Sequence, residues 1–331
     1  MRPFFLITAS LSIACLAEER RVILLDEDGW GLQGAMVEVV LTPPDDPRLA
    51  GVISRSGLTD AGGTYLFDAG ERMILSRVQA RLDGHHAIDA DQRHGLGRPS
   101  LTTTTQFTMP RVTELVSLHY REVRLTRLPA DRWIGFDAAR GDAVAPWGKG
   151  QSADFRFHLS FKQTGWTESA EALARLRKTP EGRRMDEEEW SETYGRFEGS
   201  LRLSFPRPGD GIVSSPGFWP YCLLKMPASA PADGYLAEQE IRFDTLTDMA
   251  TASDSMGSFL RVRTQRDASG KIISAHYAKI HGRIEAGPGR VAFRFYYNPR
   301  ADDRRLAFAP GRNLLRPGPG EPVHLFETQQ P

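Results

Sequence analysis

The chain has 331 residues, and its 42 basic residues (Lys plus Arg) equal its 42 acidic residues (Asp plus Glu), so the formal net charge is zero. Hydrophobic residues make up 40% and charged residues 25%, which is ordinary for a globular protein and unlike a disordered one. A nucleic-acid-binding protein gathers basic residues on one face, and no such cluster stands out here. Composition therefore argues against a nucleic-acid partner and favours one large or two ordinary domains.

The first 17 residues have the layout of a secretory signal peptide. Arg2 is a short basic end, residues 4–14 form an apolar run, and Ala17 is a small residue before the charged residues 18–21. This run is shorter than the ~20 residues that span a bilayer, and no later run approaches that length. We therefore expect residues 1–17 to be a signal peptide, the mature protein to be periplasmic or extracellular, and its chain to lack a transmembrane span.

Two cysteines bear on this prediction. Cys15 follows Ser12-Ile13-Ala14, which partly resembles the sequence that directs lipid attachment in bacterial lipoproteins. Lipid anchoring through Cys15 and simple cleavage after Ala17 are both open, and we expect cleavage. Cys222 is then the only cysteine left, so no internal disulfide can form. Since no histidine partner can be identified for it, we expect a buried, inert thiol.

Residues 18–128 alternate between strand and turn patterns and are expected to form the first domain. Apolar or alternating runs predict strands, and Asp, Gly and Pro clusters between them predict turns. The predicted strands are 22–25, 34–41, 64–67, 77–82 and the alternating segment 113–128, which is expected to close the domain.

Three short motifs in this domain resemble the carboxypeptidase-regulatory-like (transthyretin-like) family. They are Asp28-Gly29, then Gly34-Ala35-x-Val37, then Thr59-Asp60-x-x-Gly63-x-Tyr65. In the third motif, the side chain of Asp60 can cap a turn and Gly63 can take a positive φ. The resemblance covers about residues 20–128 and implies a Greek-key β-sandwich of about seven strands. It implies a scaffold or an adhesion module rather than a catalytic activity.

Residues 129–331 are predicted to form a second, β-sandwich-like domain. Phe155, Phe157, Leu159 and Phe161 share one face of a predicted strand. An Asp267–Gly270 turn predicts a hairpin, and a short helical insertion is expected near residues 167–195. The other predicted strands are 201–205, 259–263, 272–284 and 290–297.

This second half resembles a group of exported bacterial proteins that join a regulatory-like module to a second β-rich domain. The motifs that carry the resemblance include Asp142-x-Val144-Ala145-Pro146-Trp147-Gly148-Lys149-Gly150, Pro208-Gly209-Asp210-Gly211-Ile212 and Tyr297-Asn298-Pro299. No activity is established for that group, so the resemblance implies an architecture and no mechanism.

Two sets of residues have the side chains of metal ligands. His119 and Glu122 match H-x-x-E, the spacing of two zinc ligands in metallocarboxypeptidases, but positions three apart on a predicted strand point to opposite faces. We therefore expect a chance match. The second set lies in a segment predicted as a polar, solvated loop, which we favour over metal binding. Its weak candidates are Asp83, His85, His86, Asp89, Asp91 and His94. We expect no cofactor.

Aromatic residues in predicted loops of the second domain are the candidates for ligand binding, because their faces stack on sugar rings and on partner side chains. Trp147 with Lys149 is the first candidate, and Trp219 with Tyr221 is the second. The alternative is that these rings cover core edges beneath long loops. The remaining aromatic residues considered are Trp133, Trp166, Trp190 and Tyr235.

The sequence carries no nucleophile elbow, P-loop, dinucleotide fingerprint or H-E-x-x-H motif. The leading hypothesis is therefore an exported, non-catalytic binding or structural protein of the bacterial envelope that recognises a polysaccharide or a protein partner. The alternative is a hydrolase of unfamiliar type with acid-base carboxylates in the second domain. A deep pocket with two facing carboxylates would favour the hydrolase, and a flat aromatic platform would favour binding.

Overall fold

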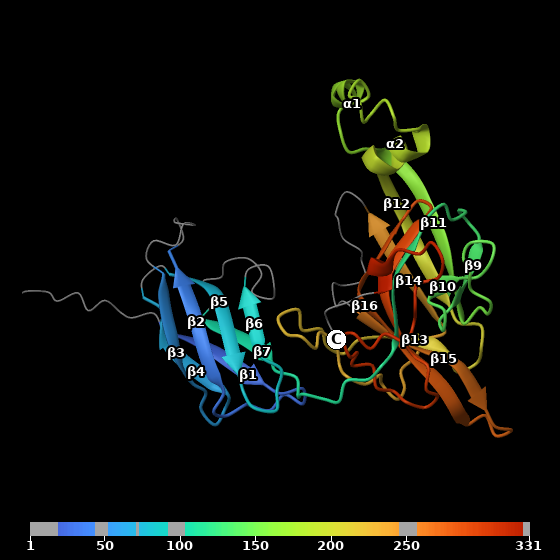
Figure 1. Ribbon diagram of the computed structural model, residues 1–331. Helices are drawn as coiled ribbons and strands as arrows, with labels where there is room; N and C mark the ends of the chain where they lie inside the picture. Colours follow the sequence, from blue (N-terminus) through green and yellow to red (C-terminus); the bar gives the residue numbers. More distant parts are fainter. Residues whose placement is uncertain (1–18, 44–51, 71–72, 92–102, 245–256, 327–331) are drawn as a thin grey trace, which may run out of the picture. The chain divides into compact units, whose positions relative to one another are not determined.

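The computed structural model describes residues 19–43, 52–70, 73–91, 103–244 and 257–326 (Figure 1). The predicted signal peptide, Cys15 and His94 lie outside these residues. Strands make up 49% and helices 6%, so the predicted mainly β class is confirmed. The chain divides into two compact units: residues 1–112 together with 220–222, and residues 113–219 together with 223–331.

The first unit contains seven described strands in two sheets. One sheet has the order β4-β1-β7 and the other β3-β2-β5-β6. All of these pairs are antiparallel except β1 with β7. Alternate residues such as Val22, Val39 and Val78 are buried in one shared core, which is the packing of a sandwich. The strands are β1 (Glu19–Leu25), β2 (Met36–Thr42), β3 (Ile53–Leu58), β4 (Thr64–Asp68), β5 (Ile74–Arg81), β6 (Ile88–Asp91) and β7 (Thr104–Thr108).

The predicted turn before β4 is confirmed in detail. One carboxylate oxygen of Asp60 accepts hydrogen bonds from the backbone N–H groups of Gly62 (2.9 Å) and Thr64 (2.8 Å). Gly63 has φ +76°, and a Cβ placed there would lie 2.2 Å from the carbonyl oxygen of Leu24. Only glycine therefore fits this position without backbone movement.

The expected boundary at residue 128 was wrong. Segment 113–128 does contain a strand, β8 (His119–Leu125), but β8 pairs with β17 of the second unit. The first unit instead takes up Pro220–Cys222, where the backbone N–H of Asp89 donates to the carbonyl oxygen of Tyr221 at 2.9 Å. Alternation shows that a strand has one buried face, but it does not identify the sheet that the strand joins.

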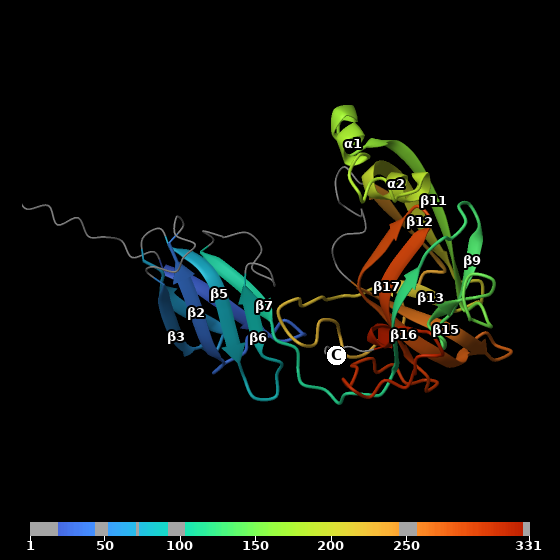
Figure 2. The ribbon, with the colours of Figure 1, turned by 45° about the horizontal axis from the view of Figure 1, so that its top comes forward.

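The second unit is a sandwich-like arrangement of two five-stranded sheets, ordered β10-β9-β11-β12-β14 and β13-β15-β16-β17-β8 (Figures 1 and 2). Phe136, Phe155, Phe157, Phe293 and Phe295 belong to the core shared by the two sheets. The remaining strands are β9 (Trp133–Asp137), β10 (Asp142–Ala143), β11 (Phe155–Trp166), β12 (Gly195–Ser204), β13 (Gly211–Ser214), β14 (Glu238–Asp244), β15 (Gly257–Arg266), β16 (Ile272–Gly287) and β17 (Arg290–Asn298).

The predicted helical insertion joins the end of β11 to the start of β12 (Figure 1). It contains α1 (Ala170–Leu176), whose N-cap is Ser169, and α2 (Glu187–Tyr194), which begins with a capping box formed by Asp186 and Glu189. A short 3-10 helix, η1 (Val323–Phe326), follows later. None of the helices in the described ranges is long and apolar enough to cross a membrane.

The outward faces of the two sheets differ. On the β8–β17 sheet, outward residues such as Tyr120, Phe259 and Tyr296 form a second core with Met226 and Phe308 from loops of the same unit. On the β9–β14 sheet, outward residues of β11 and β12 are polar and are exposed or half-exposed. This second face is therefore open for a ligand.

Candidate functional site

The first aromatic candidate, Trp147, lies in the loop after β10 with 38% of its surface exposed. Lys149, its expected neighbour in binding, has its Nζ 3.0 Å from a carboxylate oxygen of Glu321. The backbone N–H of Lys149 donates to the carboxylate of Asp142 at 3.1 Å. The ammonium of Lys149 is thus already paired within the fold, which leaves Trp147 as the accessible part of this loop.

The second aromatic candidate does not form a surface platform. Trp219 is buried in the second unit. Tyr221 is half-buried in the first unit, where its ring packs edge-on against Phe107 at 5.0 Å between centroids. Its hydroxyl accepts a hydrogen bond from the backbone N–H of Thr108 at 3.0 Å. Both side chains cover core, which was the alternative considered for them.

The residues considered as metal ligands are not gathered around one point. Asp89 and Asp91 lie in strand β6, so the predicted loop is wrong there, and Asp89 forms an ion pair with Arg77. His85 and His86 precede this strand, and the Nε2 atom of each is buried without a hydrogen-bond partner. Among the residues that the structure describes, no group of three or more His, Cys, Asp or Glu side chains could hold a metal ion.

His119 and Glu122 occupy opposite faces of β8, as expected from their spacing. His119 lies against the ring of Tyr297, with Nδ1 2.8 Å from the carbonyl oxygen of Ala139. Glu122 accepts hydrogen bonds from Arg124 instead. The two side chains therefore do not converge on one ion.

Trp133, at the start of β9, is held on the open face of its sheet and is 39% exposed. The Cζ atom of Arg156 lies 5.4 Å from its ring centroid and that of Arg202 lies 5.6 Å from it. The ring of His158 is 5.3 Å away. Two cations over one indole fix its orientation through attraction to the ring quadrupole. We call Trp133, Arg156, His158 and Arg202 the Trp133 platform.

The register of the strands explains why these residues meet. His158 on β11 is directly opposite both Trp133 on β9 and Arg202 on β12, and Arg202 is opposite Glu240 on β14. A row across four neighbouring strands, at the spacing of about 4.8 Å per strand, is therefore formed by Trp133, His158, Arg202 and Glu240. The Nε atom of Arg156 and the Nδ1 atom of His158 are buried without hydrogen-bond partners. An unpaired buried polar atom costs folding free energy, and two residues of the Trp133 platform carry one.

Two buried carboxylates of the second unit, Asp137 and Asp154, are bonded to one arginine. Arg263, with φ +57°, donates through Nε (2.8 Å) and Nη2 (2.9 Å) to Asp154, and through Nη2 to Asp137 at 3.1 Å. The hydrogen bonds to Asp154 raise the pKa of the Arg263 guanidinium. Asp137 also accepts backbone N–H groups from Gln151 and Ser152. These carboxylates stabilise the fold and have no oxygen left for acid-base chemistry.

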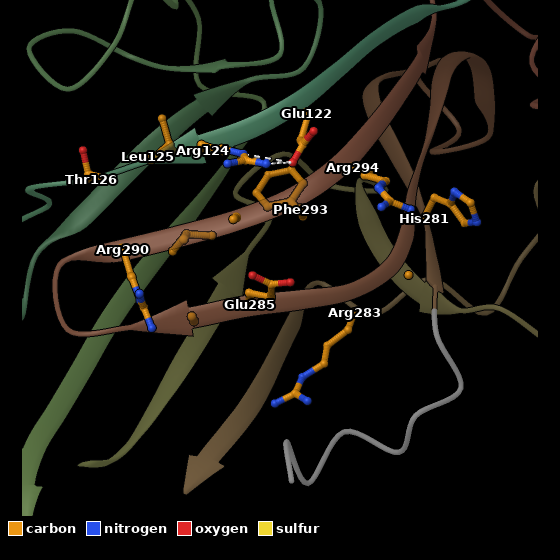
Figure 3. Close-up of a pocket in the computed structure, with 14 residues that line it drawn as sticks. Glu122, Arg124, Leu125, Thr126, His281, Arg283, Glu285, Arg290, Phe293 and Arg294 are labelled. Carbon is orange, nitrogen blue, oxygen red and sulfur yellow. Dashed lines mark hydrogen bonds and ion pairs between the residues drawn. The ribbon is translucent and has the colours of Figure 1, made fainter. Parts of the chain in front are cut away.

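A charged groove of about 610 Å³ lies on the outward face of the β8–β17–β16 strands (Figure 3). Its floor is lowered by Ala292 and by a bulge in β16, where the register jumps from His281 opposite Arg294 to Glu285 opposite Ala292. Six charged side chains line it: Glu122 and Arg124 on β8, Arg283 and Glu285 on β16, and Arg290 and Arg294 on β17. We call it the arginine groove.

His281 lies at one end of the arginine groove. Its burial, with the positive charge of Lys279 as a smaller contribution, lowers its pKa to about 3. This imidazole is therefore neutral at physiological pH and adds no charge to the groove.

No protein-family model matches this chain, and no curated protein matches it. Its class is therefore defined by its structure: a mainly β protein of two units, each built from two packed sheets. The second unit carries both the Trp133 platform and the arginine groove.

Proposed function

We propose that this is an exported, non-catalytic binding protein of the bacterial envelope, and that the Trp133 platform recognises a polysaccharide. The observation that carries the proposal is the indole of Trp133, which is 39% exposed and has the guanidinium groups of Arg156 and Arg202 beside it. Sugar rings present apolar faces that stack on an indole and hydroxyl groups that accept hydrogen bonds from guanidinium groups. An exposed aromatic ring with several polar neighbours suits this chemistry.

The length of the row favours an extended ligand. From Trp133 through His158 and Arg202 to Glu240 it crosses four strands, or roughly 14 Å at the usual strand spacing. The stacking ring at one end of the row is followed by two donors (His158 and Arg202) and then by an acceptor (Glu240). A polysaccharide lying across the strands can use all of them at once, whereas a small molecule uses only one or two.

The hydrolase alternative rests on the arginine groove, where Glu122 and Glu285 lie on strands to either side of β17. Glu122 is already hydrogen-bonded to Arg124 through Nε (2.9 Å) and Nη2 (2.5 Å). A general acid-base pair needs two carboxylates that are available to the substrate. This arrangement favours binding, and recovery of an uncleaved glycan after incubation with the protein would exclude hydrolysis of that glycan.

The test is thermal unfolding of the mature chain against a panel of neutral and acidic polysaccharides. A ligand present at about a hundred times its dissociation constant stabilises the folded state by ~2.7 kcal/mol, which shifts the melting curve measurably. We expect Trp133→Ala to abolish the shift. Trp30→Ala, which removes an indole that is 73% exposed in the first unit, is the matched control and should leave the shift intact.

Each result of this test is informative. A glycan-dependent shift that survives Trp133→Ala but disappears in Trp147→Ala would move the site to the loop after β10. No shift with any polysaccharide would contradict the proposal and favour a protein partner or an architectural role.

A further inference from the structure

The arginine groove continues into an apolar pocket. A hollow of about 340 Å³ beside the groove is lined by the aromatic rings of Phe161, Phe197 and Phe243, with the carboxylate residue Asp244 next to Phe243 on β14. Arg283, Glu285, Ala286 and Arg290 line both the groove and this hollow, so the two share a wall. A third hollow of about 330 Å³ shares Phe161, Phe197 and Pro288 with the second and adds Leu128 and Leu159. Each hollow therefore adjoins the next, and we call the three together the trough, with most of its charged residues at one end and its aromatic rings at the other.

We propose that this trough binds an amphiphilic anion, with its carboxylate or phosphate head against Arg290 and Arg283 and its apolar chain along Phe161, Phe197 and Phe243. Binding sites for small molecules are apolar hollows of this size with a few polar groups that fix the orientation of the ligand. Here Arg283 and Arg290 lie at the border of the apolar part, where Glu285 and Asp244 are the opposing carboxylates. A ligand that has only an anionic group or only an apolar chain contacts half of the trough.

The charges of the groove select an anion. Four arginines stand against two glutamates, and Glu122 is already paired with Arg124. The guanidinium groups of Arg290 and Arg294 form no hydrogen bond or ion pair with the described residues, and both side chains are exposed. Arginine forms strong, bidentate hydrogen bonds with carboxylate and phosphate groups. Glu285 is the one carboxylate of the groove without an ion pair among the described residues, and it opposes an incoming anion.

The apolar end supplies the rest of the binding free energy. Phe161 is a half-buried ring packed on the edge of the core between the sheets, and Phe197 and Phe243 are nearly buried beside it. Each CH₂ group that moves from water into such surroundings strengthens binding by roughly 4-fold. Affinity should therefore rise with the length of the chain, which a purely electrostatic site would not show.

Isothermal titration calorimetry on the full mature chain tests the ligand class, with octanoate, octyl phosphate, butyrate and 1-octanol as probes. We expect octanoate or octyl phosphate to bind at least ~10-fold more tightly than butyrate and 1-octanol. The better of the two anions identifies the head group. Equal affinity for octanoate and 1-octanol would overturn the role of the arginines, and equal affinity for octanoate and butyrate would overturn the role of the phenylalanines. Absence of binding by both octyl anions would overturn the proposal.

Variants on the exposed side of the groove test the residues without disturbing the core. Arg290→Gln should weaken binding of the preferred anion at least ~5-fold, whereas Arg175→Gln, which removes an exposed arginine on α1, should not. Glu285→Gln should tighten binding several-fold, because it removes the opposing charge. If Arg290→Gln behaves like Arg175→Gln, or Glu285→Gln weakens binding, the assignment is wrong. Trp133→Ala should leave binding of these probes unchanged, so this result is independent of the polysaccharide proposal.

Discussion

The ammonium nitrogen of Lys279 lies 4.7 Å from the ring centroid of Tyr296, inside the second unit. Lys279 is on β16 and Tyr296 is directly opposite it on β17. Burial lowers the pKa of Lys279 to about 7. Part of the cost of removing this charge from water is offset by the attraction of the ring, which is worth about 2 kcal/mol when desolvated.

We expect Lys279→Met to stabilise the second unit by about 3 kcal/mol at pH 7, since it removes the cost of burying a charge. In the unfolded chain this lysine binds a proton up to its ordinary pKa, while in the folded chain it loses the proton near pH 7. The stability of the natural protein should therefore rise as the pH increases from 7 to about 10, and Lys279→Met should lack this rise. Urea unfolding at several pH values measures both effects.

The exposed residue Lys178, which follows α1, provides the control, and Lys178→Met should change neither the stability nor its pH dependence. A Lys279→Met protein that is less stable at every pH would show that the ammonium contributes net stability.

Arg263→Ala should destabilise the second unit by about 3 kcal/mol, because it leaves Asp154 and Asp137 buried without their cation. Arg124→Ala is the matched control, since it removes an arginine that is bonded to Glu122 on the exposed face of the same unit. That change should cost less than about 1 kcal/mol. Denaturant unfolding compares the two, and equal losses would contradict the role assigned to Arg263.

Gly63→Ala should destabilise the first unit far more than Gly84→Ala. Both glycines have a positive φ, which costs alanine about 1–2 kcal/mol. A Cβ on Gly84 meets no atom within 4 Å, whereas a Cβ on Gly63 would lie 2.2 Å from the carbonyl oxygen of Leu24. The difference between the two melting temperatures therefore reports the steric contact alone. Similar losses would show that the Gly63 turn can shift.

Tyr221→Ala should destabilise the first unit by about 2–4 kcal/mol, although residue 221 lies far from that unit in the sequence. The change removes the ring from Phe107 and the hydroxyl that accepts from Thr108. Hydrogen exchange of the β7 amides should accelerate. Leu223→Ala is the control, because Leu223 is exposed. Unchanged exchange in β7 would contradict the assignment of this segment to the first unit.

The elements that depend on local pattern could be predicted from the sequence. The Asp60–Gly63 turn, the Asp267–Gly270 hairpin and the helical insertion all follow from residues that are adjacent in the chain. The alternating residues of β11 fixed its buried face for the same reason. The strands that were not predicted have short runs without a clear period, and they are β3, β6, β7, β9, β10, β13 and β14.

The positions that depend on pairing between distant segments could not be predicted. Nothing in the local pattern of residues 113–128 or 220–222 indicates which sheet each segment joins. The Trp133 platform arises only when the register places Arg156, His158 and Arg202 beside Trp133. The sequence favoured Trp147 because its loop is rich in glycine, and Trp219 because it lies beside Tyr221 in a predicted loop, and neither signal reports burial.

Trp166, the last residue of β11, is paired with Gly195, the first residue of β12, and the 28 residues between them form the helical insertion. Because the two ends of the insertion meet in a single strand pair, the fold can accept a segment of different length or composition there without altering its core. A tight two-residue turn in place of the two helices would close the same hairpin. This end of the second unit is thus a natural position for grafting a new sequence.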